Sequence, residues 1–217
     1  RHIPDALIAN NYGTSANRLG LLGVAEAEAT WSAGRDNYLL GNRSLLSLLE
    51  EKCKNVIPKI VLNKQIKRVD FTNSPIVLED SQAQRRFADK VIVTVPLSIL
   101  QANDIQFNPA LPEAKLTAIR NIGMGAGIKV VLVFNRRFWE ANTGSIYTSG
   151  SVPEYWVSSA GRSTSSFVLS GFVTGERAEA LSGQTSTVII QNLLKELDTI
   201  YGKGTATAAL TNAKVMD

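Results

Sequence analysis

One apolar run constrains the fold of this 217-residue chain more than any other feature. It extends from Ile128 to Phe134, and Lys129 is the charged residue that interrupts it. Because successive side chains of a strand point to opposite faces, Lys129 shares one face with Val131 and Val133. The run predicts a strand with a largely apolar face and a lysine near its beginning.

Shorter runs in the first half of the chain predict a second set of strands. Lys59–Asn63, Gln65–Phe71 and Ile76–Glu79 are rich in β-branched residues, and the last two are separated by turn residues. Val91–Val95 is apolar on both faces, which favours a strand buried in a parallel sheet. Pro96 ends that run.

Helical signals alternate with these strands. Residues 1–36 are predicted to be helical with polar breaks, and residues 17–30 among them mix apolar and acidic side chains. A further helix begins at Ser44, and another begins at Pro112. A fourth spans about Thr185–Tyr201 and places four apolar residues on one face: Ile189, Leu193, Leu197 and Ile200. Three further strands are expected: Ser145–Thr148, Tyr155–Ser158 and Ser166–Val173. The sum predicts an α+β (α/β mixed) fold.

Composition excludes several classes of protein. With 44% apolar and 19% charged residues the chain is not a disordered one, and no run approaches the ~20 apolar residues of a membrane span. One cysteine, Cys53, and one histidine, His2, exclude a disulfide framework and a cysteine-based zinc site, and argue against histidine-based catalysis. The net charge of +4 is scattered, without the basic stripe that nucleic acid requires. An enzyme with this sequence relies on a cofactor.

The glycine-rich stretch Gly123–Gly127 has the composition of a phosphate-binding loop but not its context. A dinucleotide-binding turn follows a strand and opens a helix, whereas here a helix is predicted before the stretch and a strand after it. A P-loop is excluded because Val130 follows Lys129. The stretch predicts a flexible link between a helix and a strand.

Two kinds of side chain are candidates for a functional site. Lys129 is a surface residue by the usual interpretation, but in an enclosed site it would donate hydrogen bonds or handle a proton. Four aromatic residues offer either pocket walls or, more often at this density, core: Trp31, Trp139, Tyr155 and Trp156.

Several segments occur in an order that is typical of one enzyme family. They are Tyr38–Gly41 before the Ser44 helix, Ile60–Ile66, Ala88–Leu97, Ile105–Pro112, and Gly123–Phe134 continuing to Trp139. Together they resemble the flavin-containing amine oxidases, a family of monoamine and polyamine oxidases, L-amino-acid oxidases and related histone demethylases. The resemblance covers about residues 38–139 and continues more weakly through Gly171–Glu176 to the end.

This resemblance implies roles for four residues. Lys129 is similar to the family's lysine that holds a water against flavin N5, and it is the expected catalytic residue. Ile66 occupies the place of an apolar residue whose backbone meets the adenine end of FAD. Val95 and Pro96 end a strand that approaches the cofactor. The implied cofactor is FAD and the implied partner is a small-molecule amine; no metal, nucleic acid or membrane segment is expected.

The resemblance also implies a division into domains. Residues 1–52 and 103–217 correspond to a substrate domain, a mixed sheet flanked by helices, and residues 53–102 correspond to strands of an incomplete FAD-binding domain. We expect residues 59–95 to form a sheet separate from that of residues 128–134, and Lys129 to point into an interdomain cavity. The family's glycine-rich turn and its C-terminal flavin-binding segment are missing from the sequence. We therefore expect an inactive internal fragment.

The expected activity of the complete protein is FAD-dependent oxidation of an amine to an imine, with dioxygen reoxidising the flavin. Two alternatives stay open: a flavin desaturase or dehydrogenase of the same superfamily, and a non-catalytic interaction module on this scaffold. The sequence leaves open which amine is oxidised, how the flavin is attached, and the oligomeric state. It also leaves the compartment open, although a single cysteine is compatible with the cytoplasm.

Overall fold

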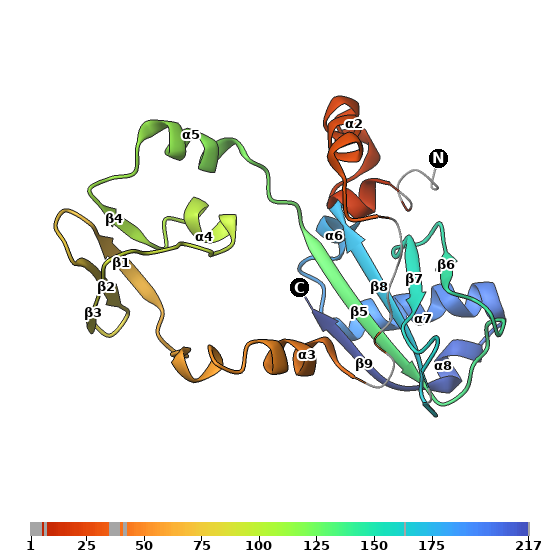
Figure 1. The fold of residues 1–217 in the computed structure, drawn as a ribbon. Coiled ribbons are helices and arrows are strands. Elements are labelled where there is room, and N and C mark those ends of the chain that lie inside the picture. Colours follow the sequence, from red (N-terminus) through yellow and green to blue (C-terminus); the bar gives the residue numbers. More distant parts are fainter. Residues whose placement is uncertain (1–5, 7, 35–39, 41–42, 163, 217) are drawn as a thin grey trace. The chain divides into compact units, whose positions relative to one another are not determined.

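The computed structural model describes the chain apart from residues 1–5, 7, 35–39, 41–42, 163 and 217. Helices and two separate sheets make an α+β fold, which confirms the predicted class (Figure 1). The chain divides into two compact units. The larger unit comprises Arg1–Leu45 and Gly125–Asp217, and the smaller unit comprises Leu46–Met124.

Five strands form the sheet of the larger unit. In sheet order they are β6 (Ser145–Tyr147), β7 (Glu154–Val157), β8 (Phe167–Thr174), β5 (Gly127–Phe134) and β9 (Leu210–Met216). Each pair is antiparallel, so the prediction of a mixed sheet here is wrong. Short connections join β6, β7 and β8, and such connections pair consecutive strands in opposite directions.

Helices cover one face of this sheet. The longest is α7 (Ser186–Tyr201), accompanied by α6 (Gly175–Leu181) and α8 (Thr205–Ala209), and it buries four apolar side chains against the sheet: Ile189, Leu193, Leu194 and Leu197. The prediction that Ile200 belongs to this face is wrong, because Ile200 lies in the last turn and is 49% exposed. The other three predicted positions are confirmed.

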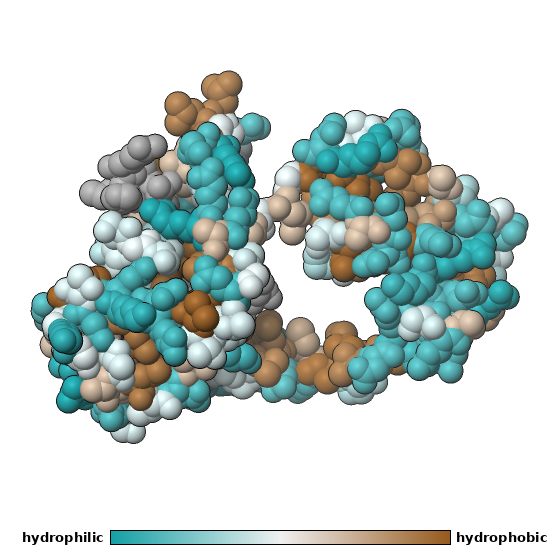
Figure 2. Space-filling model, turned by 180° about the vertical axis from the view of Figure 1, so that it is seen from behind, coloured by the Kyte–Doolittle hydropathy of each residue, from teal (hydrophilic) through white to brown (hydrophobic). Residues whose placement is uncertain are grey.

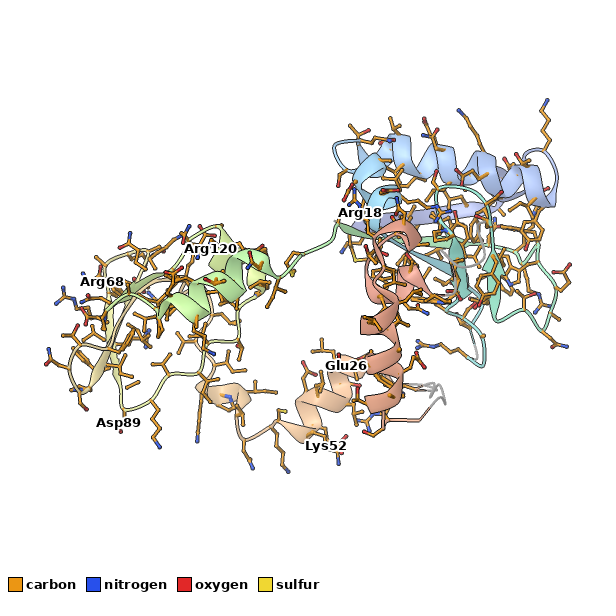
Figure 3. The ribbon with its side chains drawn as sticks, turned by 90° about the horizontal axis from the view of Figure 1, so that it is seen from above. Arg18, Glu26, Lys52, Arg68, Asp89 and Arg120 are labelled. Carbon is orange, nitrogen blue, oxygen red and sulfur yellow. The ribbon has the colours of Figure 1, made fainter. Side chains whose placement is uncertain are left out.

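The N-terminal part of the larger unit is built from short helices: η1 (Ala9–Tyr12), η2 (Ala16–Arg18) and α2 (Leu21–Thr30). Short helices with breaks are what the sequence predicted for residues 1–36, and none of the residues of α2 is buried. Arg18 anchors the segment through an ion pair of 2.7 Å with Glu179 of α6 (Figure 3).

The smaller unit contains a four-stranded mixed sheet. Its order is β3 (Arg85–Ala88), β2 (Ile76–Asp80), β1 (Ile66–Asp70) and β4 (Gln106–Asn108). The β1–β4 pair is parallel and the others are antiparallel. The predicted separation from the sheet that holds β5 is confirmed. Because β4 pairs with β1, the smaller unit extends to Met124, beyond the boundary that we predicted at residue 102.

The helices of the smaller unit are short. They are α3 (Leu45–Lys52), whose first residue still belongs to the larger unit, η3 (Ile57–Lys59), α4 (Leu97–Gln101) and α5 (Glu113–Asn121). The helices predicted at Ser44 and Pro112 are confirmed, with Pro112 at the N-cap of α5. The motif Tyr38–Gly41 lies outside the described residues except for Leu40.

Two predicted strands are absent from the part of the chain that the structure describes. In Lys59–Asn63, Lys59 ends the 3₁₀ turn η3 and the remaining residues are irregular chain, and Val91–Val95 is irregular as well. A strand needs a partner for its backbone hydrogen bonds, and neither segment appears among the paired strands. Ile92, expected to be buried, is 87% exposed. Figure 2 shows hydrophobic residues at the surface along the segment of α3 and η3.

In the described residues, no helix combines the length and the apolar character needed to cross a membrane. The same residues contain no group of three or more acidic, cysteine or histidine side chains that could hold a metal ion.

Candidate functional site

Side chains of the strand β5 alternate between a buried face and an open face of the larger sheet. Ile128, Val130, Leu132 and Phe134 are each at most 1% exposed and form the core under α7. Lys129 is exposed, and Val131 and Val133 are partly buried. The alternation that the sequence predicted is confirmed, and Lys129 lies near the start of its strand as expected.

Neighbouring strands extend the open face around Lys129. Lys129 pairs with Phe172 of β8 on one side and with Met216 of β9 on the other. Paired residues of antiparallel strands point to the same face, about 5 Å apart at Cβ. The next row contains Val131 with Ser170 and Lys214, so a central lysine lies beside an aromatic ring and aliphatic side chains.

An aromatic pair forms one wall of the open face. The rings of Trp156 and Phe172 are stacked, with centroids 6.3 Å apart and planes 21° apart, and Trp156 is 37% exposed. Two residues after Trp156 in the chain, Ser158 donates a hydrogen bond of 2.8 Å from its hydroxyl to that of the buried Ser170. The open face thus combines flat apolar surface with hydroxyl groups and two ammonium groups, of Lys129 on β5 and Lys214 on the edge strand β9.

The other aromatic candidates do not belong to this face. Trp139 and Tyr155 are core residues, at 5% and 0% exposure, and burial raises the pKa of the Tyr155 phenol. Trp31 is 65% exposed and donates a hydrogen bond to the carbonyl of Gly34. The sequence could have predicted that Tyr155 and Trp156 lie on different faces of the sheet, since adjacent residues of a strand point to opposite faces.

Sequence reasoning missed Asn10, which fixes the end of β8 next to the open face. This side chain is 3% exposed. Its Nδ2 donates to the Phe172 carbonyl at 3.0 Å, and its Oδ1 accepts from the Thr174 amide at 3.0 Å. The carboxamide replaces the backbone partners that the strand lacks there, so η1 holds Phe172 in register. No local pattern in the sequence points to a pairing over such a separation.

The predicted cofactor residues lie in the smaller unit. Ile66 begins β1 and is partly buried, Val95 is partly buried in irregular chain, and the exposed Pro96 is the N-cap of α4. They belong to the same unit, whereas Lys129 belongs to the larger one. Their roles toward FAD and that of Lys129, as well as the interdomain cavity, stay predictions.

The described residues do not by themselves fit the pyrophosphate of FAD. That group requires backbone N–H donors at a helix N-terminus that follows a strand and a glycine-rich turn. The stretch Gly123–Gly127 instead connects the end of α5 to the start of β5. The reversed polarity predicted from the sequence is confirmed, and the stretch offers no such helix N-terminus.

A pocket of about 610 Å³ lies in the smaller unit between α4, β4 and α5. Its wall includes Leu100, Phe107 and Leu116, and the amide of Gln101 ties α4 to α5 by donating to the Ile119 carbonyl at 2.9 Å. None of the described residues that line it carries a carboxylate, thiol or imidazole. The pocket therefore carries no group for acid–base or nucleophilic chemistry.

Comparison with known proteins identifies the family of this chain. Residues 32–214 match the profile of the family described as flavin containing amine oxidoreductase. The chain belongs to this family, whose members are flavoprotein oxidoreductases.

Two curated relatives illustrate the breadth of the family. The lysine-specific histone demethylase 1 of Caenorhabditis elegans is 32% identical over 79% of this chain and 24% of its own length. The probable polyamine oxidase 4 of Arabidopsis thaliana is 38% identical over 48% of this chain and 22% of its own length. The chain thus spans about a quarter of these relatives.

Solved structures share the fold at lower identity. Cyclohexylamine oxidase from Brevibacterium oxydans superposes with a TM-score of 0.73, at 17% identity, over 100% of this chain and 48% of that one. A putrescine oxidase bound to putrescine gives a TM-score of 0.67, at 20% identity, over 80% of this chain and 38% of that one. At these identities the likeness establishes the fold alone.

Proposed function

We propose that a protein containing this chain oxidises a small-molecule amine to an imine, and that the open face around Lys129 forms part of the substrate site. Family membership supports the class of reaction. The polyamine oxidase relative and the two similar structures are named for polyamines, putrescine and cyclohexylamine, all of which are amines, whereas the other relative is named as a lysine-specific histone demethylase. FAD, when bound, supplies the electron acceptor for this reaction.

The observation that carries the proposal is the place of Lys129 on the interior strand β5, beside the stacked pair of Trp156 and Phe172. The aromatic surface packs against the hydrocarbon part of an amine. The ammonium group of Lys129 donates hydrogen bonds to a water or to a lone pair. Its positive charge also disfavours a protonated amine nearby, so that the neutral amine, which keeps its lone pair, is favoured.

We propose further that the exposed apolar segments of the smaller unit are packing surfaces for the rest of an FAD-binding domain. Ile92 and Val93 are 87% and 43% exposed in a run whose composition is that of a buried strand. A sheet supplied by additional chain would bury this run and would bring the missing pyrophosphate donors. The 217-residue chain alone is then expected to be colourless and inactive.

The first test is Lys129→Met in a protein that also contains the nucleotide-binding segment. We expect FAD to remain bound while the single-turnover rate of amine oxidation falls about 10²-fold, a loss of about 3 kcal/mol in transition-state stabilisation. The matched control is Lys214→Met, since Lys214 lies on the same face but on the edge strand β9. Its rate should change less than threefold.

Four results would contradict these proposals. An unchanged rate in Lys129→Met, or an equal loss in Lys214→Met, removes Lys129 from the mechanism. A stoichiometric flavin absorbance band in the 217-residue chain overturns the argument that the pyrophosphate site is incomplete. A protein that contains the nucleotide-binding segment and binds no flavin would favour the interaction module instead.

A further inference from the structure

The larger unit has a second pocket at the end of β5 opposite Lys129. It has a volume of about 190 Å³ and lies between the loop after β5 and the turn that joins β7 to β8. Since a strand rises about 3.3 Å per residue, Lys129 and Phe134 lie roughly 17 Å apart along β5. The pocket lies around the Phe134 end of β5, and none of the side chains assigned to the open face lines it.

Two arginines line this pocket. Arg137 comes from the loop after β5 and Arg162 from the β7–β8 turn. The fold thus brings two segments that are distant in the sequence to one pocket. Among the described residues neither has a carboxylate within ion-pair distance; Arg137 makes one long hydrogen bond, of 3.4 Å, to the Ala141 carbonyl. Two cations on one small pocket without a protein counter-ion attract an anion from solution.

Hydroxyl groups complete the set of donors. Ser159 Oγ accepts a hydrogen bond of 3.1 Å from the Val168 amide, and Thr164 Oγ1 accepts one of 3.1 Å from the Ser166 amide. These contacts occupy an oxygen lone pair and leave each hydroxyl hydrogen free to donate. Both hydroxyl-bearing residues line the pocket.

The base of the pocket is formed by packed aromatic rings. Trp139 and Phe167 line it and pack edge to face, with centroids 6.4 Å apart and planes at 84°. Trp139 is only 5% exposed and belongs to the core. The turn above the base is closed by a hydrogen bond from the Arg162 amide to the Ser159 carbonyl, at 3.2 Å. A preformed site loses little entropy when it binds a ligand.

We propose that this pocket binds a small tetrahedral oxyanion, either inorganic phosphate or the phosphate of a monoester. Two guanidinium groups match the double charge of such a group, and guanidinium and hydroxyl donors together match its several acceptor oxygens. A carboxylate carries a single charge and two acceptor oxygens, so it would leave some of the guanidinium and hydroxyl donors of the pocket without a partner. This inference does not depend on amine oxidation.

The test is calorimetric titration of the 217-residue chain with inorganic phosphate at low ionic strength, with acetate at matched ionic strength as the comparison anion. We expect saturable binding of phosphate and weaker binding of acetate. The double variant Arg137→Gln/Arg162→Gln should lose at least tenfold in affinity. Phenyl phosphate distinguishes the two sources, because a monoester site binds it at least as tightly as phosphate, whereas a site for the free ion binds it more weakly.

The matched control is Arg136→Gln, which removes a neighbouring exposed arginine that does not line the pocket. Its affinity should stay within twofold of the parent chain. Equal binding of acetate and phosphate, or an equal loss in Arg136→Gln and in the double variant, would overturn the proposal. If the double variant fails to fold by circular dichroism, Arg162→Gln alone replaces it, since that residue lies in an exposed turn.

Discussion

The two sheets of this molecule differ in how they are covered. The larger unit buries an extensive apolar core between one face of its sheet and α7. In the described part of the smaller unit, the buried side chains are Val69 and Asp80 alone, and its helices α4 and α5 contain no buried residue. Coverage by an amphipathic helix, rather than the apolar content of the strands, decides which unit has a core of its own.

Val91–Val95 makes the same point within one segment. It is more apolar than β1, which has lysine, arginine and aspartate among its residues, yet β1 is a paired strand and Val91–Val95 is not. Apolar side chains bury themselves only where a partner surface exists, and hydrogen bonds of a strand require a neighbour. The smaller unit is therefore expected to be the less stable one.

The largest effect on the free energy of unfolding is expected from truncating a leucine to alanine, and the two units should differ in this effect. Leu193→Ala removes a side chain that is 0% exposed and should lower the free energy of unfolding by about 3 kcal/mol. Leu62→Ala removes one that is 75% exposed and should cost less than about 0.5 kcal/mol. Urea denaturation measures both. Equal losses would show that the smaller unit buries Leu62 in solution.

The tryptophans allow the two units to be followed separately. Trp31, Trp139 and Trp156 all belong to the larger unit, so their fluorescence reports its unfolding alone, whereas far-ultraviolet circular dichroism reports both units. If the comparison is correct, the dichroism signal begins to change at lower urea than the fluorescence does. Coincident transitions would contradict it.

A smaller loss is expected from adding a methyl group inside the larger unit. A Cβ at Gly171 would lie 2.8 Å from Val152 Cγ1 and 3.2 Å from Tyr155 Cε1, so Gly171→Ala should cost about 1–3 kcal/mol. Gly144→Ala is the control, because a Cβ there meets nothing within 4 Å. Thermal unfolding followed by fluorescence compares them. A similar melting temperature for both variants would indicate a looser core than the structure shows.

The smallest effect concerns acid sensitivity of the smaller unit. Hydrogen bonds from the Asn108 side chain and then from the Thr72 amide and hydroxyl lower the pKa of Asp70 to about 2. Because this pKa lies below the unfolded value near 4, Asp70 stabilises the fold above about pH 4, and the contribution disappears as the pH falls toward 2.

Asp70→Asn should therefore flatten the loss of stability of the smaller unit between about pH 4 and pH 2. Hydrogen exchange of the β1 and β4 amides at several pH values measures it. The control is Asp89→Asn, an exposed carboxylate of the same unit (Figure 3), which should leave the slope unchanged. If Asp70→Asn and Asp89→Asn change the dependence of stability on pH equally, the acid sensitivity results from net charge and not from the hydrogen bonds of Asp70.

Sequence patterns predicted the parts of the fold that local physics decides. The alternation from Ile128 to Phe134 placed Lys129 on the open face, and the spacing in α7 identified Ile189, Leu193 and Leu197 as buried. Long periodic segments are informative because the buried face and the periodicity agree. The prediction of a buried strand at Val91–Val95 is wrong because burial also depends on a partner strand or surface, which no local sequence pattern reveals.

The candidate site was predictable only in part for the same reason. Lys129 stood out as a charge in an apolar run, but its neighbour Phe172 follows from the register between β5 and β8, which the sequence does not reveal. Asn10 lies still further away in sequence and gives no periodic signal. The Arg137 and Arg162 pocket likewise depends on two loops that meet only in the folded unit.

The strand order has a consequence for synthesis of the chain. The strand β5 lies between β8 and β9, so both of its hydrogen-bonding partners leave the ribosome after it does. The hairpins of β6, β7 and β8 close locally, but the outer edge of β5 stays unpaired until Leu210–Met216 has emerged. An unpaired apolar edge is a template for association with other chains. Translation that stalls before Leu210 would therefore leave a nascent chain prone to aggregate.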